Sequence, residues 1–262
     1  MSNGESALRL AAAEAVAREA GALALRYFRD RDRLVVEKKG AQDLVSEADR
    51  AVETAIRGRI GELFPDDGFI GEEHAPKPAA AGCGDWVVDP IDGTWCFLNG
   101  IGSWCVSIAY AREGTIETGV VYDPNAEELF AARRGNGATL NGRRITVADA
   151  HSFTDGTLSI GFSPRRGPEH VVRIIDRLLA QGGIHHRHGS GALGLAWTAA
   201  GRLIGYIEPH MNAWDCLAGL LLIEEAGGFT GDFLADDGLH RGNPVCAGPR
   251  GLEEAMRALV QP

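Results

Sequence analysis

Helix-like and strand-like segments alternate along almost the whole chain, and this mixture restricts the possible folds more than any other feature of the sequence. Residues 5–30 and 46–62 have the pattern of helices. Three strand-like runs follow at residues 103–114, 115–124 and 127–142, and turns rich in Gly, Asn and Pro separate them. We therefore expect an antiparallel meander in the middle of the chain.

The second half alternates strands and helices. The expected elements are a strand at 156–162, a helix near 167–181, a helix at 190–201, a strand at 203–208, a helix at 213–228 closed by two glycines, and a short strand at 243–249. This mixture is typical of layered α/β sheets rather than a bundle or a barrel. We predict one α/β domain over residues 1–262, with an N-terminal α+β half of about 1–150 and a C-terminal α/β half of about 151–262.

Acidic residues lie in the first turn of the second expected helix and in the segment that follows this helix in the chain. Ser46 stands at the expected N-cap, and Asp49 three residues later completes a capping-box-like pattern. Beyond the helix, "FPDDGFIGEE" predicts a turn and a short strand that ends in Glu72 and Glu73.

The charge balance limits the classes of partner. The chain has 262 residues, of which 45% are hydrophobic, and its formal net charge is −10. This balance argues against nucleic acid or an anionic membrane as the main partner. It still allows an anionic small substrate, provided that bound cations invert the local field.

Cysteine usage and the N-terminus predict a location. The chain has five cysteines and no CxxC pair; they are Cys83, Cys96, Cys105, Cys216 and Cys246. An odd, scattered set without a signal-peptide pattern predicts reduced thiols in the cytoplasm. The first helix carries Glu14, Arg18 and Glu19 at helical spacing, so we interpret it as amphipathic rather than as a targeting segment. No apolar run is long enough to span a bilayer.

The stretch "WVVDPIDGTWCF", residues 86–97, places Asp89 and Asp92 three positions apart directly after an apolar run. Asp, Pro and Gly are common in turns, so a plain turn would explain the stretch. A metal site would explain it equally, because Mg²⁺ prefers oxygen ligands and often takes one or two carboxylates. Glu72 and Asp215 lie at comparable strand ends and helix starts, where α/β folds bind ligands.

Each of the two outlying acids also has a purely structural interpretation. Asp215 alone could stabilise the start of its own helix, and Glu72 alone could be an exposed loop acid. Gly93 and Thr94 add a second ingredient, because a helix that begins there would present free N–H groups to a phosphate. The segment Gly189–Gly191 opens another expected helix in the same way. Cations beside a helix start make a place to bind and cleave a phosphoester.

One rival phosphatase chemistry does not fit. Phosphatases that form an aspartyl-phosphate carry two aspartates separated by a single residue, in the pattern DxDGT. Here Pro90 occupies the position of the nucleophile. The spacing favours metal ligation and an attacking water instead.

Four motifs together resemble the inositol monophosphatase family over nearly the whole chain. They are "GEE" at 71–73, "DPIDGT" at 89–94, "GSGA" at 189–192 and "WDCLAGLLLIEEAGG" at 214–228. The resemblance implies a layered αβαβα sandwich and Mg²⁺-dependent hydrolysis of a phosphate monoester. It also implies a homodimer and inhibition by Li⁺.

The resemblance assigns metal ligands residue by residue. Glu72, Asp89 and the Ile91 carbonyl would hold a first Mg²⁺ ion, and Asp89, Asp92 and Asp215 a second. Glu72 would reach a third, weaker ion, and it counts among the catalytic residues.

The same resemblance assigns the other roles. Thr94 paired with Asp49 would orient and deprotonate the attacking water, and the amides of Gly93 and Thr94 would cradle the phosphate. The residues on the substrate's alcohol side would be Gly189, Ser190, Gly191, Glu208 and Asp215.

The chain departs from the family pattern at several positions. Trp95 and Cys96 replace the residues of the common "GTTNF", and we interpret Cys96 as a packed thiol rather than a nucleophile. Gly191 replaces a common alanine, which we expect to loosen the substrate wall. Three histidines, His185, His186 and His188, predict a polar loop near the substrate rather than a transition-metal site, because no carboxylate accompanies them.

Inositol 1-phosphate is the leading substrate. The partners we expect are a small phosphorylated polyol and a second copy of the chain. We expect no direct contact with nucleic acid and none with a membrane. The alternatives within enzymes are another polyol or sugar phosphatase, acting on histidinol phosphate or fructose 1,6-bisphosphate. Relatives of the histidinol type tend to carry Asp-Cys where this chain has Ser190 and Gly191. A regulatory protein that binds transcription or ribosome components is the alternative from another class.

Overall fold

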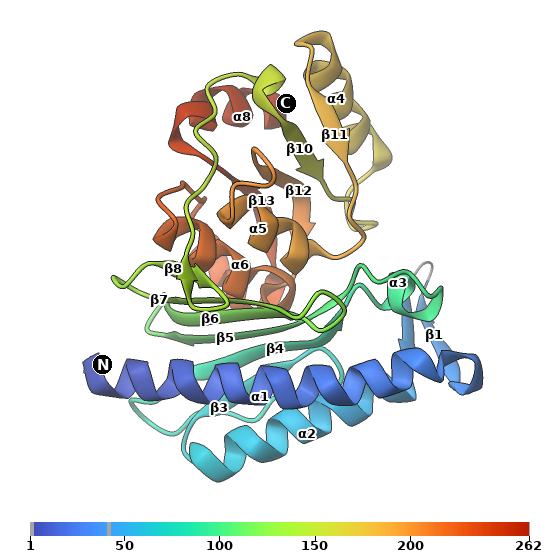
Figure 1. Ribbon diagram of the computed structural model, residues 1–262, viewed down its shortest axis with the longest axis vertical. Coiled ribbons are helices and arrows are strands. Elements are labelled where there is room, and N and C mark those ends of the chain that lie inside the picture. The colour runs from blue at the N-terminus through green and yellow to red at the C-terminus, as the bar shows by residue number, and fades with distance from the viewer. Residues whose placement is uncertain (1–2, 41–42, 262) are drawn as a thin grey trace.

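The computed structural model describes residues 3–40 and 43–261, and it arranges them in alternating layers of helices and sheets (Figure 1). From the bottom of Figure 1 upward these are helices α1 and α2, a large sheet, helices α5 and α6, a smaller sheet, and helices α4 and α8. The helix bounds are Asn3–Arg29 (α1), Glu47–Leu63 (α2), Pro168–Ala180 (α4), Gly191–Ala199 (α5), Ala213–Glu225 (α6) and Glu253–Val260 (α8). This order confirms the layered αβαβα sandwich.

The large sheet has seven strands within the described residues, in the order β3-β4-β5-β6-β7-β8-β9. Their bounds are Gly68–Gly71, Asp85–Asp92, Cys105–Arg112, Thr115–Asp123, Glu128–Arg133, Ala138–Leu140 and Arg143–Arg144. Strands β3 and β4 are parallel and the later pairs are antiparallel, so the predicted meander is confirmed. Glu113 and Gly114 join β5 to β6 with positive φ angles of 52° and 73°, as two-residue hairpin turns require.

The smaller sheet has the order β11-β10-β12-β13 in the described part of the chain. Its strands are β10 (Thr157–Ile160), β11 (Ile184–His186), β12 (Tyr206–Met211) and β13 (Asn243–Ala247). The prediction of a polar loop at His185 and His186 was wrong, because both residues belong to β11, which pairs with β10 in parallel. Main-chain hydrogen bonds form this exposed edge strand, and a sheet edge tolerates polar side chains.

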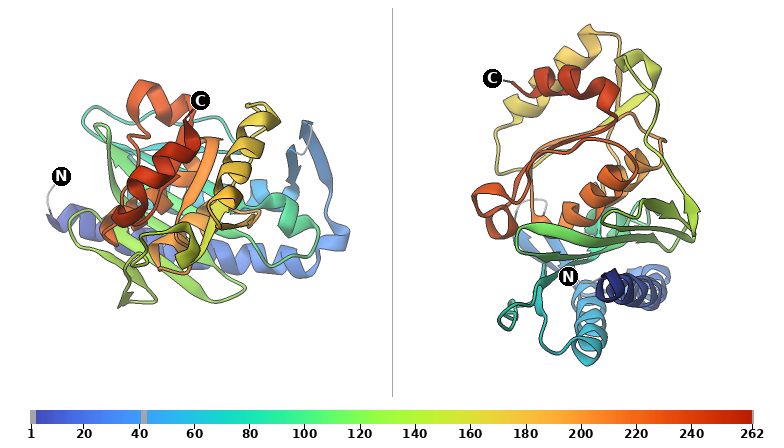
Figure 2. Two further views of the ribbon diagram at one scale, coloured as in Figure 1. Left: turned by 90° about the horizontal axis from the view of Figure 1, so that it is seen from above. Right: turned by 90° about the vertical axis from the view of Figure 1, so that its left-hand side faces the viewer.

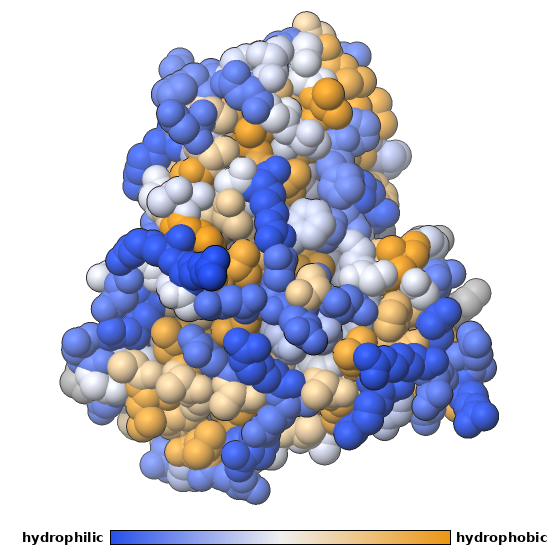
Figure 3. Space-filling view, in the orientation of Figure 1, coloured by the Kyte–Doolittle hydropathy of each residue, from blue (hydrophilic) through white to orange (hydrophobic). Residues whose placement is uncertain are grey.

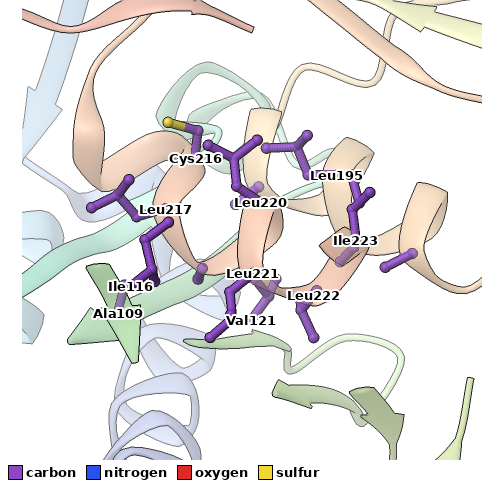
Figure 4. Close-up of a cluster of buried hydrophobic side chains, with 14 of the residues drawn as sticks. Ala109, Ile116, Val121, Leu195, Cys216, Leu217, Leu220, Leu221, Leu222 and Ile223 are labelled. Atoms are coloured by element: carbon purple, nitrogen blue, oxygen red, sulfur yellow. The ribbon is translucent and has the colours of Figure 1, made fainter. Parts of the chain in front are cut away.

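Helix α6 lies between the two sheets and is buried around its whole circumference. Every residue from Cys216 to Ile223 is buried, as expected for a helix that is apolar on all sides. Figure 4 shows its side chains beside Leu195 of α5 and Val121 of the large sheet. The approach is close, because a Cβ added to Gly119 would lie 2.8 Å from the Ala218 Cα atom. Its position between the sheets makes α6 the centre of the main core.

Helices α1 and α2 cover the opposite face of the large sheet (Figure 2, right). Buried residues of α1 recur every three or four positions, including Ala13, Val16, Ala17 and Ala20, which confirms an amphipathic helix. Its outer side is rich in alanine, and Figure 3 shows pale orange residues gathered over it. Among the described helices, each is too short or too polar to cross a membrane.

Several short elements complete the structure. Two strands, β1 (Val36–Gly40) and β2 (Asp43–Ser46), form an antiparallel hairpin that the sequence pattern did not predict. The remaining elements are helices α3 (Thr94–Leu98) and α7 (Gly238–Arg241), and the 3₁₀ turns Arg31–Arg33, Phe153–Asp155, Ala235–Asp237 and Arg250–Leu252. Helix α8 was also missed, although its buried Met256 and Leu259 show a helical spacing. The five cysteines are free thiols.

Candidate active site

Strand β4 ends in a bulge that carries both aspartates of the "DPIDGT" motif. Between the pairs that Asp89 and Asp92 make with β5, the bulged strand has one more residue than its partner. Such an insertion bends a strand and re-aims its side chains. Pro90 lies within the bulge, where a missing N–H costs no ladder bond. The Ile91 N–H donates to Asp89 Oδ1 at 2.9 Å, and both aspartates line one cavity of about 200 Å³.

Gly93 begins helix α3 in a conformation that only glycine adopts easily. Its φ is +98°, and a Cβ added there would lie 2.8 Å from the Ser103 carbonyl oxygen. The next residue, Thr94, has its Oγ1 atom 3.2 Å from Asp49 Oδ1 and 3.2 Å from the Ile91 carbonyl oxygen. The helix start thus places the Thr94 hydroxyl beside a carboxylate that comes from α2.

Asp49 reaches the site from a capped helix start. Its Oδ2 atom accepts from the Ser46 N–H at 2.9 Å and from the Ser46 hydroxyl at 2.7 Å, which confirms the predicted capping box. Asp49 is only 1% exposed. Burial raises the pKa of Asp49, and the hydrogen bonds from Ser46 and Thr94 oppose that rise. One carboxylate oxygen therefore caps the helix while the other contacts Thr94.

Three acids converge where β3, β4 and α6 meet. One oxygen each of Glu72, Asp89 and Asp215 lies within 4.8 Å of the other two. Burial and the neighbouring charge of Glu72 raise the pKa of Asp89 well above its ordinary value. Burial and Asp92 raise the pKa of Asp215 to about 7. Carboxylates this close, of which Asp89 is buried and the other two are partly buried, repel one another unless a cation binds. An all-oxygen set fits a hard ion such as Mg²⁺.

Asp92 joins the end of β4 to the start of α5. Its Oδ2 atom accepts from the Ser190 hydroxyl at 2.5 Å and from the Ala192 N–H at 2.7 Å. Burial raises the pKa of Asp92, and these hydrogen bonds oppose the rise. Asp215 likewise completes a capping box at the start of α6, where the Asn212 N–H donates to its Oδ2 at 3.1 Å. Both acids therefore stabilise a helix start while they line the cavity.

Glu208 stands on the far side of the cavity, on β12. The Tyr206 hydroxyl donates to Glu208 Oε2 at 2.5 Å. Burial raises the pKa of Glu208 to about 8, and the hydrogen bond from Tyr206 and the nearby Arg187 oppose the rise. Gly189 faces the same cavity with a positive φ of +92°.

The comparison with known families decides the identity of this constellation. The model of the inositol monophosphatase family matches residues 6–261. This chain belongs to the inositol monophosphatase family. It is 38% identical to an inositol-1-monophosphatase of Rhizobium meliloti over 248 residues, which are 93% of this chain and 92% of the relative. It is 37% identical to the Nus factor SuhB of Escherichia coli K12 over 246 residues, 92% of this chain and 91% of that one.

A solved structure agrees over the whole fold. The extragenic suppressor protein suhB from Bartonella henselae superimposes with a TM-score of 0.91 at 33% identity, covering 97% of this chain and 98% of that chain. The layered sandwich described above is therefore the fold of this family.

The cavity collects most of the residues that the family motifs predicted. These are Glu72, Asp89, Asp92, Gly93, Thr94, Gly189, Ser190, Gly191, Glu208 and Asp215. Asp49 and Ile91 lie behind this lining, and each contacts it through the Thr94 hydroxyl. Glu72 follows the end of β3 at Gly71, so the strand ends two residues before the predicted end at Glu73.

Further lining residues were missed. They are Ser159, Ile160, Gly161, Phe162, Arg187, Tyr206, Met211 and Asn212, whereas His188, which was expected near the substrate, also lines the cavity. The rule that ligands bind beyond the carboxyl ends of parallel strands could have identified Gly161 and Phe162, which follow β10. No sequence signal identified Arg187, because its place depends on how β11 pairs.

The departure at Gly191 does not loosen the substrate wall, so that prediction was wrong. A Cβ added to Gly191 would lie 2.5 Å from Met211 Cε and 3.3 Å from the Tyr206 hydroxyl oxygen. Met211 is 3% exposed, and its flexible side chain occupies the space that an alanine methyl would take.

The departures at Trp95 and Cys96 differ in burial. Trp95 is 48% exposed, whereas Cys96 is buried. The Cys96 Sγ atom lies 3.9 Å from the His188 carbonyl oxygen, and burial raises the pKa of this thiol. This environment confirms a packed thiol rather than an activated nucleophile.

Proposed function

We propose that this chain is a Mg²⁺-dependent phosphoric monoester hydrolase and that inositol 1-phosphate is its substrate. One observation carries the proposal: the oxygens of Glu72, Asp89 and Asp215 lie within 4.8 Å of one another beside the hydrogen-bonded Thr94 and Asp49. Acids and a positioned hydroxyl in one small cavity are what hydrolysis of a phosphate ester requires.

The acids would hold two or three Mg²⁺ ions. A first ion would bind Glu72, Asp89 and the Ile91 carbonyl, and a second would bind Asp89, Asp92 and Asp215. Glu72 would also reach a third, weaker ion. When bound, the ions would lower the pKa of the attacking water and neutralise charge on the phosphate and the leaving alkoxide.

Thr94 and Asp49 would handle the proton of the attacking water. The Thr94 hydroxyl contacts Asp49 Oδ1 at 3.2 Å, so its oxygen can accept a proton from water while its own proton passes to Asp49. The raised pKa of Asp49 makes it a better proton acceptor than an exposed aspartate. Asp49 is held in place because its second oxygen is bound to Ser46.

The remaining residues would bind the substrate. The amides of Gly93 and Thr94 would cradle the phosphate at the start of α3. The alcohol part would face Gly189, Ser190, Gly191, Glu208 and Asp215. A carboxyl group on Glu208 can form hydrogen bonds with two polyol hydroxyls.

Phosphate release from a panel of monophosphates, with and without Mg²⁺, tests the proposal. The panel contains inositol 1-phosphate, glycerol 2-phosphate, histidinol phosphate and fructose 1,6-bisphosphate. We expect turnover that requires Mg²⁺ and is fastest with inositol 1-phosphate. Equal turnover after treatment with EDTA would contradict the metal-dependent mechanism. A faster rate with another member of the panel would identify that compound, rather than inositol 1-phosphate, as the preferred substrate.

The family resemblance supports three further parts of the proposal: a homodimer, a cytoplasmic location and inhibition by Li⁺. Light scattering after gel filtration measures the mass in solution. A Li⁺ titration of the Mg²⁺-dependent rate measures inhibition.

A regulatory role is the second candidate, because one relative is named a Nus factor. This chain would then bind transcription or ribosome components. The net charge of −10 disfavours direct contact with RNA, so a protein partner is the expected target. Capture of transcription or ribosomal proteins from lysate by a Glu72→Gln variant without turnover would separate this role from catalysis.

A further inference from the structure

Glu53 is a buried acid that the catalytic proposal does not use. It lies on α2 one turn after Asp49, and its side chain is completely buried. Residues four apart on a helix lie on the same face. The helix that presents Asp49 to Thr94 therefore presents a second carboxylate further along the same side.

The Glu53 carboxylate is surrounded by hydrogen-bond donors from the loop after β3. The Glu73 N–H donates to Oε2 at 2.7 Å, and the His74 N–H donates to Oε1 at 3.1 Å. His74 Nδ1 lies 3.0 Å from Oε1, and the Arg57 guanidinium donates to the same oxygen at 3.3 Å. A buried carboxylate with this many donors holds the main chain around it firmly.

These contacts bracket the acid Glu72. Glu73 and His74 follow it directly, and Gly71 precedes it. A Cβ added to Gly71 would lie 2.4 Å from the Glu53 carboxyl carbon and 2.5 Å from each carboxylate oxygen. The carboxylate therefore lies against the chain on both sides of Glu72, where glycine alone leaves room for it.

We propose that Glu53 is a positioning residue that orders the main chain around Glu72, so that the Glu72 carboxylate meets Asp89 and Asp215 before a metal ion binds. The inference rests on the metal site of the proposed function. Pre-ordering matters because these acids repel one another, and a loose loop would let Glu72 move away from the others. Helix α2 thus serves as one rigid support for the water-orienting pair and for a metal ligand.

The substitution Glu53→Gln removes the negative charge and one hydrogen-bond acceptor of the side chain but keeps its volume. The two main-chain N–H groups and the Arg57 guanidinium can only donate. A glutamine of the same shape would turn its own NH₂ group toward at least one of these donors. The loop would lose a hydrogen bond on one side of Glu72 without a change in packing volume.

Asp67 provides a matched control at the opposite end of the same strand. It directly precedes β3, is 3% exposed, and accepts hydrogen bonds from Arg9 at 2.9 Å and from Trp86 Nε1 at 3.0 Å. Asp67→Asn removes a carboxylate that is buried and hydrogen-bonded much like that of Glu53. It lies four residues before Gly71, at the end of β3 remote from Glu72.

Calorimetric titration with Mg²⁺ in the absence of substrate tests the inference on wild type, Glu53→Gln, Asp67→Asn and Glu72→Gln. Loss of a partner that orients a ligand typically weakens metal affinity by about 10–100-fold, and we expect this for Glu53→Gln. Asp67→Asn should keep the wild-type affinity although both variants melt at a lower temperature. The kcat of Glu53→Gln should recover at saturating Mg²⁺, so that the defect lies in the Mg²⁺ requirement.

The outcomes distinguish this inference from the proposed function. Wild-type Mg²⁺ affinity in Glu53→Gln, together with weak binding in Glu72→Gln, would overturn the role of Glu53 alone. Wild-type affinity in Glu72→Gln would refute the metal site, and the inference with it. Amide hydrogen exchange on the metal-free wild-type protein gives a test that needs no variant. We expect slow exchange at Glu73 and His74, and exchange at the rate of a free chain would also overturn the role.

Discussion

At the scale of single residues, three acids of the candidate site also stabilise the start of a helix. Asp49 caps α2, Asp215 caps α6, and Asp92 accepts the Ala192 N–H at the start of α5. Helix starts carry partial positive charge, so they stabilise these anions next to one another. Main-chain donors therefore help to stabilise the negative charge that a metal site would need.

We predict that Asp215→Asn and Asp92→Asn each remove most activity without unfolding the protein. The pKa of Asp215 is about 7 because burial and Asp92 oppose its charge, and a neutral side chain relieves that repulsion. Asparagine also keeps an oxygen for capping. The metal-free variants should melt at or above the wild-type temperature. Phosphate release at saturating Mg²⁺ measures the loss. A kcat near wild type would contradict the assignment of Asp92 and Asp215 as metal ligands.

A capping acid outside the cavity controls for this prediction. Asp155 closes a capping box on Ser152 and is not among the residues that line the cavity. Asp155→Asn should leave the Mg²⁺-dependent rate unchanged.

Thr94→Ala and Asp49→Asn should each lower kcat by about 10²–10⁴-fold, the usual contribution of a positioned acid–base group. The two groups share one 3.2 Å hydrogen bond, so they act as a unit. The double variant should therefore lose much less than the product of the single losses. A double-mutant cycle on kcat measures this coupling, and fully multiplicative losses would show two independent roles.

Glu208→Ala should reduce the preference for inositol 1-phosphate over glycerol 2-phosphate. A hydrogen bond to a charged group is worth about 1.5–3 kcal/mol, so the ratio of the two kcat/KM values should fall about tenfold or more. Hydrolysis of an aryl phosphate should be spared because its leaving group has no hydroxyls to bind.

The contact between Glu208 and Tyr206 calls for its own control. Tyr206→Phe removes the hydroxyl that donates to Glu208 at 2.5 Å but keeps the carboxyl group. This variant should retain the preference for inositol 1-phosphate. An unchanged ratio in Glu208→Ala would show that Glu208 is not a substrate contact.

At the scale of elements, α6 holds the layers together. It packs against the large sheet on one side and against α5 and the smaller sheet on the other. Its first turn carries Asp215, so the same helix that fills the core also positions a site acid.

Leu221→Ala in α6 should lower the free energy of unfolding by about 2–5 kcal/mol, because the lost side chain leaves a cavity in a close-packed region. Leu221 is fully buried. Leu179 on α4 is 53% exposed, and Leu179→Ala should change stability by less than about 0.5 kcal/mol. Urea unfolding of both variants measures the difference, and equal losses would contradict the central place of α6.

At the scale of the whole molecule, the cavity lies where elements of both halves of the chain meet. His188, which follows β11, contacts Ser103, which precedes β5: the Ser103 hydroxyl donates to the His188 carbonyl oxygen at 3.0 Å. The His188 ring also packs on Trp197, with ring centroids 4.1 Å apart. The hydrogen bond between Ser103 and His188 joins segments that flank strands of the two different sheets.

The partly buried ring of His188 should contribute to the pH dependence of stability. Burial and the neighbouring His186 lower the pKa of His188 to about 4 from an ordinary 6.5. Between these two values the unfolded chain binds the proton and the folded protein does not. The contribution of His188 to the free energy of unfolding should therefore fall as the pH drops from 6.5 toward 4, by at most about 1.4 kcal/mol per pH unit. The raised pKa values of Asp215 and Glu208 act in the opposite direction over this range, so the contribution of His188 is measured as the difference between wild type and a His188 variant.

Urea unfolding across this pH range measures the slope. Relative to wild type, His188→Gln should lose less free energy of unfolding as the pH drops, whereas His151→Gln, at an exposed position, should keep the wild-type slope. A slope in His188→Gln equal to that of wild type would exclude a contribution from His188.

The sequence alone determined the layered α/β class, the meander, the capping box at Ser46 and the family of the chain. These depend on local patterns: residue spacing within one element, turn residues, and motifs read in order. Four acids of the site, Glu72, Asp89, Asp92 and Asp215, were identified in the same way, because strand ends and helix starts mark where an α/β fold gathers its ligands. The roles of Asp49 and Glu208 came from the family resemblance.

Only the tertiary structure decided which side chains meet across long separations. Ser190 donates to Asp92 over 98 positions, and Met211 fills the space beside Gly191. Glu53 had the pattern of an ordinary helix acid until the loop that carries Glu72 was seen around it. The reason is physical: helix and strand periodicity follows from the local backbone, whereas the burial and partners of a polar group depend on how separate layers pack.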